Sequence, residues 1–132
     1  MTEIKLPSLG TDVDCACGRV HHILTRAIKV EQGVLDKIPA LMDEYGLAGR
    51  CLIVSDRNTF EAAGRHVEQV LRRAGRAVSA LVITRESVHA DEETLGEIMM
   101  AMEPRPDVLI AVGTGSLNDS TRYVARHVGL PY

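Results

Sequence analysis

The sequence predicts an α/β fold in which a parallel sheet is flanked by helices, and three observations lead to this prediction. Short apolar runs, typical of strands buried on both faces, alternate along the chain with amphipathic segments of helical period. Glycine or proline separates most of these segments, as expected of turns. The 132 residues suffice for one core and contain no repeat or linker. We therefore expect a single domain with four or more parallel strands.

The first half of the chain is expected to hold two strands and one helix. Residues 1–20 are polar and interrupted by proline and glycine, which predicts irregular structure. Apolar side chains tend to alternate over 22–30, which predicts a strand. An apolar stripe at helical spacing predicts a helix over 34–45. The apolar run 51–54 predicts a strand buried on both faces.

The second half continues the alternation of helix and strand. Helical periodicity predicts helices over 59–74, from the N-cap Asp91 through Met102, and over 116–128. Apolar runs predict strands over 78–83 and 108–112. One helical stripe is expected entirely in the core, and it consists of Leu95, Ile98, Met99 and Met102.

The composition excludes several classes of protein. A formal net charge of −3 and only 3% aromatic residues give no basis for binding nucleic acid. No apolar segment approaches the roughly 18 residues of a membrane span, and the first residues lack the pattern of a secretory signal. Three cysteines, an odd number, fit a reducing compartment. We expect a cytoplasmic protein without a nucleic-acid or membrane partner.

Two loops that follow expected strands carry polar chemistry. Gly113–Ser116 lies between a strand and a helix, where glycine lets the backbone approach a phosphate and helix N–H groups face the anion. Asp56 follows the strand 51–54, where its carboxylate either binds a ribose diol or caps the next helix. Ligands of open parallel sheets bind beyond the carboxyl ends of the strands, where both loops are expected.

The order of these loops excludes the standard dinucleotide fingerprint. In that fingerprint the glycines come first and the acid follows about twenty residues later. Here Asp56 precedes Gly113 by 57 residues, and no third glycine follows at the usual spacing. A different arrangement of the same chemistry is therefore required.

The observed order resembles the dehydroquinate synthase-like and iron-containing alcohol dehydrogenase superfamily, and within it the sn-glycerol-1-phosphate dehydrogenases. The last matching segment is long and specific, and the others fall in the right order. The matching segments are Cys15–His21, Val54–Thr59, Ala90–Glu92 and Ala111–Ala125. The resemblance implies a Rossmann-like domain that binds NAD(P), and an oxidoreductase that interconverts dihydroxyacetone phosphate and glycerol 1-phosphate with zinc or nickel.

The resemblance also implies roles for individual residues. Asp56 would contact the adenine ribose, and Asp119 would reach toward the nicotinamide and the phosphorylated substrate. The pyrophosphate would lie on the loop made of Gly113, Thr114, Gly115 and Ser116. An acid at position 56 repels a 2′-phosphate, so NAD is preferred to NADP. Alternatively, Asp119 has no role in binding and lies in the first turn of its helix because the helix dipole stabilises an acidic side chain there.

The chain departs from this family in one large respect. Family members carry a second, helical domain whose Asp and two His bind the metal, and no positions of this sequence match them. We expect residues 1–132 to be the nucleotide-binding domain alone, truncated relative to the family, with no catalytic or metal-binding residue and no activity of its own. Apolar surface left exposed is expected to drive homo-oligomer formation.

Three alternatives stay open at this point. The chain could be a dehydroquinate synthase-like lyase domain or a non-catalytic nucleotide-binding module. Cys15, Cys17, His21 and His22 suggest a zinc site, but the spacing is not that of a Cys-x2-Cys knuckle and no second ligand pair follows. A loop packed beside the first strand is the favoured interpretation of that segment.

Overall fold

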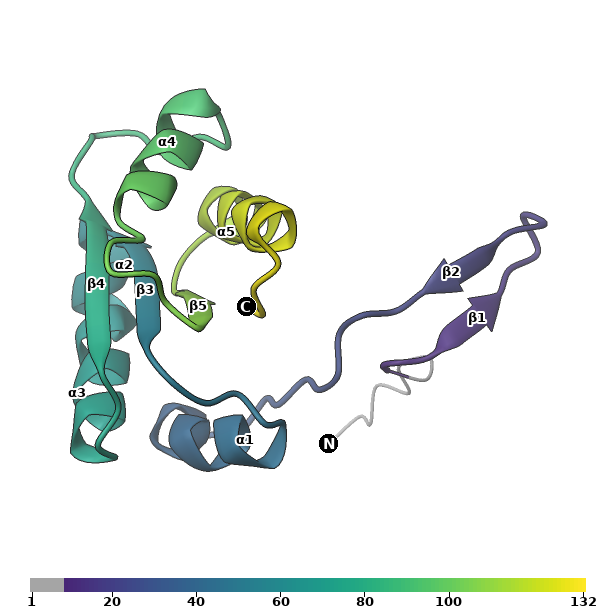
Figure 1. The fold of residues 1–132 in the computed structure, drawn as a ribbon, viewed down its shortest axis with the longest axis horizontal. Coiled ribbons are helices and arrows are strands. Elements are labelled where there is room, and N and C mark those ends of the chain that lie inside the picture. Colours follow the sequence, from purple (N-terminus) through teal and green to yellow (C-terminus); the bar gives the residue numbers. More distant parts are fainter. Residues whose placement is uncertain (1–8) are drawn as a thin grey trace. The chain divides into compact units, whose positions relative to one another are not determined.

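The structure is a computed structural model that describes residues 9–132. Contacts divide the chain into one unit up to Val34 and a second unit, Leu35–Tyr132. The second unit contains a three-stranded sheet in the order β4-β3-β5, and both neighbouring pairs are parallel (Figure 1). The expected parallel sheet with flanking helices is confirmed. The expectation of four or more parallel strands is wrong for the described residues.

The central strand of the sheet is β3, Cys51–Asp56, which lies between β4, Val78–Ile83, and β5, Val108–Ala111. Its first five residues are buried because both faces are covered by helices. Leu52 and Val54 face one core, and Cys51 and Ile53 face the other, as the two-residue period of a strand requires.

Two pairs of helices supply these cores (Figure 1). On one face Met42 of α1, Ile38–Glu44, packs with Val67 and Leu71 of α3, Arg65–Arg73. On the other, Ile98 of α4, Glu92–Met100, packs with Leu117 and Val124 of α5, Gly115–Val128. Helix α1 follows a 3-10 turn, Val34–Lys37. The sheet is therefore the middle layer of three.

The helix that follows β3 is continuous but not uniform. It begins as α2, Arg57–Thr59, passes through a π-helical turn, Phe60–Gly64, and continues as α3. A Cβ added at Gly64 would lie 2.8 Å from Cδ2 of Phe60. Glycine is therefore the residue that fits inside this wide turn.

The apolar stripe expected to lie entirely in the core is buried only in part. Ile98 and Met102 are buried as expected, but Met99 is 57% exposed. It lies beyond the edge of the stripe, because α4 packs on the sheet over a narrower arc than the apolar pattern covers. No helix over residues 9–132 is long and apolar enough to cross a membrane.

The unit up to Val34 contains an antiparallel hairpin of β1, Asp12–Asp14, and β2, Val20–His22. The strand expected over 22–30 is wrong, because regular structure stops at His22. Its alternating apolar residues meet no packing partner to fix a pleat: Leu24 is 80% exposed and Val30 is 90% exposed. The expectation of irregular structure over residues 1–20 is also wrong at Asp12–Asp14, which form β1.

Candidate functional site

The three parallel strands end at one edge of the sheet, and their last residues carry the polar chemistry. Asp56, at the end of β3, pairs in register with Ile83 at the end of β4. On the other side Val54 pairs with Ala111, and the Val112 N–H donates to the Val54 carbonyl over 2.9 Å. Asp56 is the last residue of β3, and Gly113 follows the end of β5 by two residues, so both lie at this edge of the sheet after neighbouring strands. The fold thus brings together two sites that are 57 residues apart in sequence.

Asp56 is the N-cap of the helix that follows it. Its Oδ1 accepts a 2.8 Å hydrogen bond from the Thr59 N–H, and Thr59 Oγ1 accepts one of 3.0 Å from the Asp56 N–H. This reciprocal capping box confirms the capping interpretation, with the helix starting at Arg57. Oδ2 of Asp56 has no hydrogen-bond partner among the described residues. The carboxylate therefore keeps one oxygen available to a ligand.

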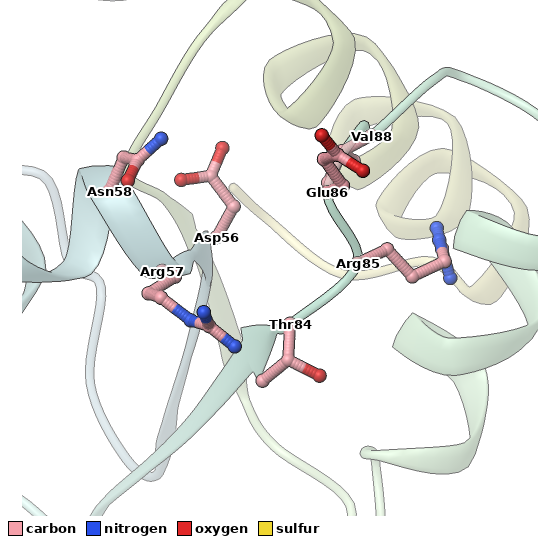
Figure 2. A pocket seen from close by; sticks show the side chains of 7 residues that line it. All are labelled: Asp56, Arg57, Asn58, Thr84, Arg85, Glu86 and Val88. Atoms are coloured by element: carbon pink, nitrogen blue, oxygen red, sulfur yellow. The ribbon is translucent and has the colours of Figure 1, made fainter.

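A cavity of about 300 Å³ opens beside this carboxylate (Figure 2). It lies between the loops that follow β3 and β4. Its lining is mainly polar and consists of Asp56, Arg57, Asn58, Thr84, Arg85, Glu86 and Val88. The loop 84–86 was missed from sequence because it contains no recognisable motif. Its position directly after a strand of a parallel sheet was the signal that could have found it.

The two arginines of this cavity have different surroundings. The guanidinium of Arg85 contacts α4: it lies 2.7 Å from Glu97, 3.4 Å from Glu93 and 2.7 Å from the hydroxyl of Thr94. Arg57 has no ion-pair or hydrogen-bond partner in the part of the chain that the structure describes. Arg85 therefore ties the loop to α4, and Arg57 is the cation left for a ligand.

Helix α4 is itself capped at this edge of the sheet. The Asp91 side chain accepts a 3.0 Å hydrogen bond from the Thr94 N–H, as expected for an N-cap at that position. That bond from the backbone holds the pKa of the Asp91 carboxyl below its usual value. The carboxylate of Asp91 is therefore occupied by the backbone of its own helix.

The glycine loop follows β5 and opens α5. Thr114 is the N-cap residue, and its side chain makes no capping hydrogen bond. A Cβ on Gly115 would meet nothing within 4 Å, whereas a Cβ on Gly113 would lie 2.2 Å from Cδ1 of Leu117, which is fully buried. Gly113 is thus required for packing, and Gly115 borders open space. The first amides of α5 are left for an anion to bind.

Asp119 does not lie where the sequence analysis expected. Because α5 begins at Gly115, its first turn contains no acidic residue and Asp119 falls in the second turn. The explanation by the helix dipole is therefore wrong. The Asp119 side chain is 59% exposed and forms an ion pair of 3.0 Å with Arg122. An approach of Asp119 to a nicotinamide or a substrate stays a prediction.

The arrangement as a whole suits an elongated ligand with anionic groups. Asp56 and Arg57 border a polar cavity on one side of β3, and unpaired helix amides lie at the end of β5 on its other side. The cavity lining contains no residue of Gly113–Ser116, so the cavity and the glycine loop are two separate parts of the candidate site. A dinucleotide has this layout, with a sugar diol separated from a pyrophosphate.

Comparisons with known proteins identify relatives of this chain. The family model described as iron-containing alcohol dehydrogenase matches residues 29–132. A glycerol-1-phosphate dehydrogenase, NAD(P)+, of Halalkalibacterium halodurans is 30% identical over 123 residues, which cover 90% of this chain and 31% of the relative. A protein of the same name from Bacillus velezensis is 40% identical over 84 residues, covering 61% and 21%. The chain thus spans about a third or less of these curated relatives.

A solved structure shares the fold. The crystal structure of the NADH-dependent butanol dehydrogenase A of Thermotoga maritima superimposes with a TM-score of 0.58 and 20% sequence identity. The match covers 71% of this chain and 24% of that one. A similarity at this identity supports the architecture of the sheet and its helices.

Proposed function

Because the chain belongs to the iron-containing alcohol dehydrogenase family, we propose that it forms the nucleotide-binding part of an NAD(P)-dependent dehydrogenase of the glycerol-1-phosphate dehydrogenase type. Relatives of that name match up to 90% of its length. One observation carries the proposal: β3 and β5 are neighbouring parallel strands, so Asp56 and the loop that begins at Gly113 follow their ends at the same edge of the sheet. This is the edge at which parallel sheets bind nucleotides.

The residues of the site fit the proposed cofactor. Oδ2 of Asp56 would accept from a hydroxyl of the adenine ribose while Oδ1 continues to cap the helix. The amides of Gly115 and Ser116 would bind the pyrophosphate, with Thr114 in the same loop and Gly113 shaping the turn. The bound nicotinamide supplies the hydride acceptor or donor of the reaction. Asp119 is proposed to lie on the nicotinamide and substrate side.

The choice between NAD and NADP is proposed to depend on two neighbouring side chains. Asp56 disfavours a 2′-phosphate by charge repulsion. Arg57 lines the same cavity without a partner among residues 9–132, and its guanidinium could pair with that phosphate. We therefore expect NAD to bind more tightly, with NADP as a weaker alternative.

The chemistry of the family also needs a divalent metal, for which we propose zinc or nickel. A Lewis acid is needed to polarise the carbonyl of dihydroxyacetone phosphate. The part of the chain that the structure describes contains no cluster of one Asp and two His side chains close enough to hold an ion. We propose that residues 1–132 bind dinucleotide but do not by themselves turn over a small phosphorylated substrate.

Localisation and assembly are also proposals. We expect the protein in the cytoplasm, where the dinucleotide and the phosphorylated substrate are available. We expect it to form homo-oligomers, since Met99 and Met100 on α4 and Tyr123 on α5 supply exposed apolar surface.

Calorimetric titration of the purified chain with NADH tests the central proposal. We expect one site per chain. The variant Asp56→Asn keeps a side chain that caps helices well but removes the charge, so it should bind NADP+ more tightly and NAD+ more weakly than the native chain. Absence of NADH binding by the folded chain would refute the proposal. Oxidation of glycerol 1-phosphate by the chain with NAD+ and added zinc or nickel would refute its inactivity.

A further inference from the structure

The hairpin of the first unit gathers three side chains that ligate metals. The Sγ atoms of Cys15 and Cys17 and a ring nitrogen of His21 all lie within 4.8 Å of one another. Sγ of Cys17 and Nε2 of His21 are 3.2 Å apart. All three residues are exposed, so an ion can reach them from solvent.

The backbone of the hairpin creates this cluster. Asp14 pairs with Val20 as the last register pair, and the Cys15 N–H donates to the Arg19 carbonyl over 3.0 Å. The Gly18 N–H then donates to the Cys15 carbonyl over 2.9 Å, and Gly18 has a φ of +81°, which glycine adopts without strain. This tight turn folds Cys17 back over β2.

The alternation of β2 selects which histidine joins the cysteines. Neighbouring side chains of a strand point to opposite faces. His21 lies with Cys17, whereas Nδ1 of His22 lies 2.5 Å from Oδ1 of Asp12 across the hairpin. His22 is thus engaged elsewhere, and it provides a matched control for His21.

Little else holds these residues in place. Each strand has three residues, and all six except Val13 are exposed. A two-stranded hairpin of this size is at best marginally stable in water. A bound ion would cross-link the turn to β2, and its binding free energy would add to the stability of the hairpin.

We propose that Cys15, Cys17 and His21 form a binding site for a thiophilic divalent cation of the zinc class. Two thiolates balance the charge of the ion, the neutral imidazole is the third ligand, and water or a donor from another molecule takes the fourth tetrahedral position. Binding releases the two thiol protons to solvent. The Cys-x2-Cys spacing of a zinc knuckle is not required at this site, because the third ligand, His21, comes from β2.

The test is a titration of the full chain with Co²⁺ and then Zn²⁺ in the presence of a non-thiol reductant. We expect one equivalent of Co²⁺ to bind with thiolate-to-cobalt charge-transfer absorption, and Zn²⁺ to displace it. Cys17→Ser and His21→Gln should each weaken Zn²⁺ binding at least about tenfold, since even loss of an outer-shell partner costs 10–100-fold. His22→Gln should bind as the native chain does.

A second readout follows the hairpin itself. Zn²⁺ should slow hydrogen exchange of the Cys15 amide, which donates to Arg19, in the native chain and in His22→Gln but not in Cys17→Ser. Three results would overturn the proposal: no uptake of metal by the reduced chain, uptake without the thiolate absorption, or equal affinity in all the variants. NADH binding is measured separately, so this site and the proposed function can fail independently.

Discussion

The substitution Gly115→Ala separates the role of the glycine loop in binding from any role in folding. A Cβ at this position meets nothing within 4 Å, and the residue is the first of α5 with no positive φ. Alanine is therefore accommodated without a clash or backbone strain. The added methyl group would nevertheless occupy the space in which we place the pyrophosphate, beside the first amides of the helix.

Gly115→Ala is expected to weaken NADH binding without lowering the free energy of unfolding. A hydrogen bond to a charged group contributes about 1.5–3 kcal/mol, so loss of one amide–phosphate contact should weaken NADH binding about 10- to 150-fold. Alanine is favoured over glycine inside a helix by up to about 1 kcal/mol, so the free energy of unfolding should stay equal or rise. A variant that is at least as stable but binds poorly is the expected result.

Calorimetry with NADH and chemical denaturation measure the two quantities on the same samples. Gly96→Ala is the matched control, because Gly96 lies in α4 and its added Cβ also meets nothing within 4 Å. That control should bind NADH as tightly as the native chain. If Gly115→Ala binds NADH as well as Gly96→Ala does, the pyrophosphate does not lie on this helix terminus and the reasoning is wrong.

The remaining predictions concern stability, specificity and pH. Gly49→Ala should lower the free energy of unfolding by about 1–3 kcal/mol in urea denaturation, because Gly49 has a φ of +95° and its Cβ would lie 2.2 Å from Oδ2 of Asp107; an unchanged midpoint would contradict this. Arg57→Gln should weaken NADP+ binding several-fold and leave NAD+ binding unchanged in parallel titrations. An equal loss of affinity for both cofactors would mean that Arg57 contacts a group that NAD+ and NADP+ have in common. The hydrogen bond from the Thr94 N–H lowers the pKa of Asp91 in the folded state. The charged Asp91 cap therefore stabilises the fold fully above the unfolded-state pKa of about 4, and this stabilisation is lost as the pH falls through the folded-state pKa. In melting experiments the native chain should therefore lose more stability on acidification than Asp91→Asn, which caps without titrating, and parallel profiles would exclude this role.

Local signals in the sequence predict the core elements well. The strand expected over 78–83 has those bounds in the structure, and Asp91 caps α4 as expected. Both elements belong to the layers around one sheet, so the apolar positions in their sequence pattern correspond to buried side chains. The strand expected over 22–30 fails because its alternating residues, such as Leu24, have no sheet face to pack against.

The candidate site was predictable only in part. Asp56 and Gly113–Ser116 stand out because glycine and acid follow buried runs. Their adjacency depends on β5 pairing with β3 and not with β4, and strand order is a long-range property that local patterns do not contain. The loop that contains Thr84 carries no recognisable motif, and only its position directly after the strand 78–83 indicated that it lies at this edge of the sheet.

The π-helical turn at Phe60–Gly64 determines how the two ends of this helix are oriented relative to each other. A π turn accommodates one extra residue, which rotates everything after it by about 100° relative to a regular helix. The cap at Asp56 can therefore present its free oxygen to the cavity while Val67 and Leu71 still face the core. A one-residue deletion within the turn would force a choice between these two orientations. The π turn therefore sets the angle between the ligand-facing end and the packed face of this helix, so its length of five residues is as important to the site as Asp56 itself.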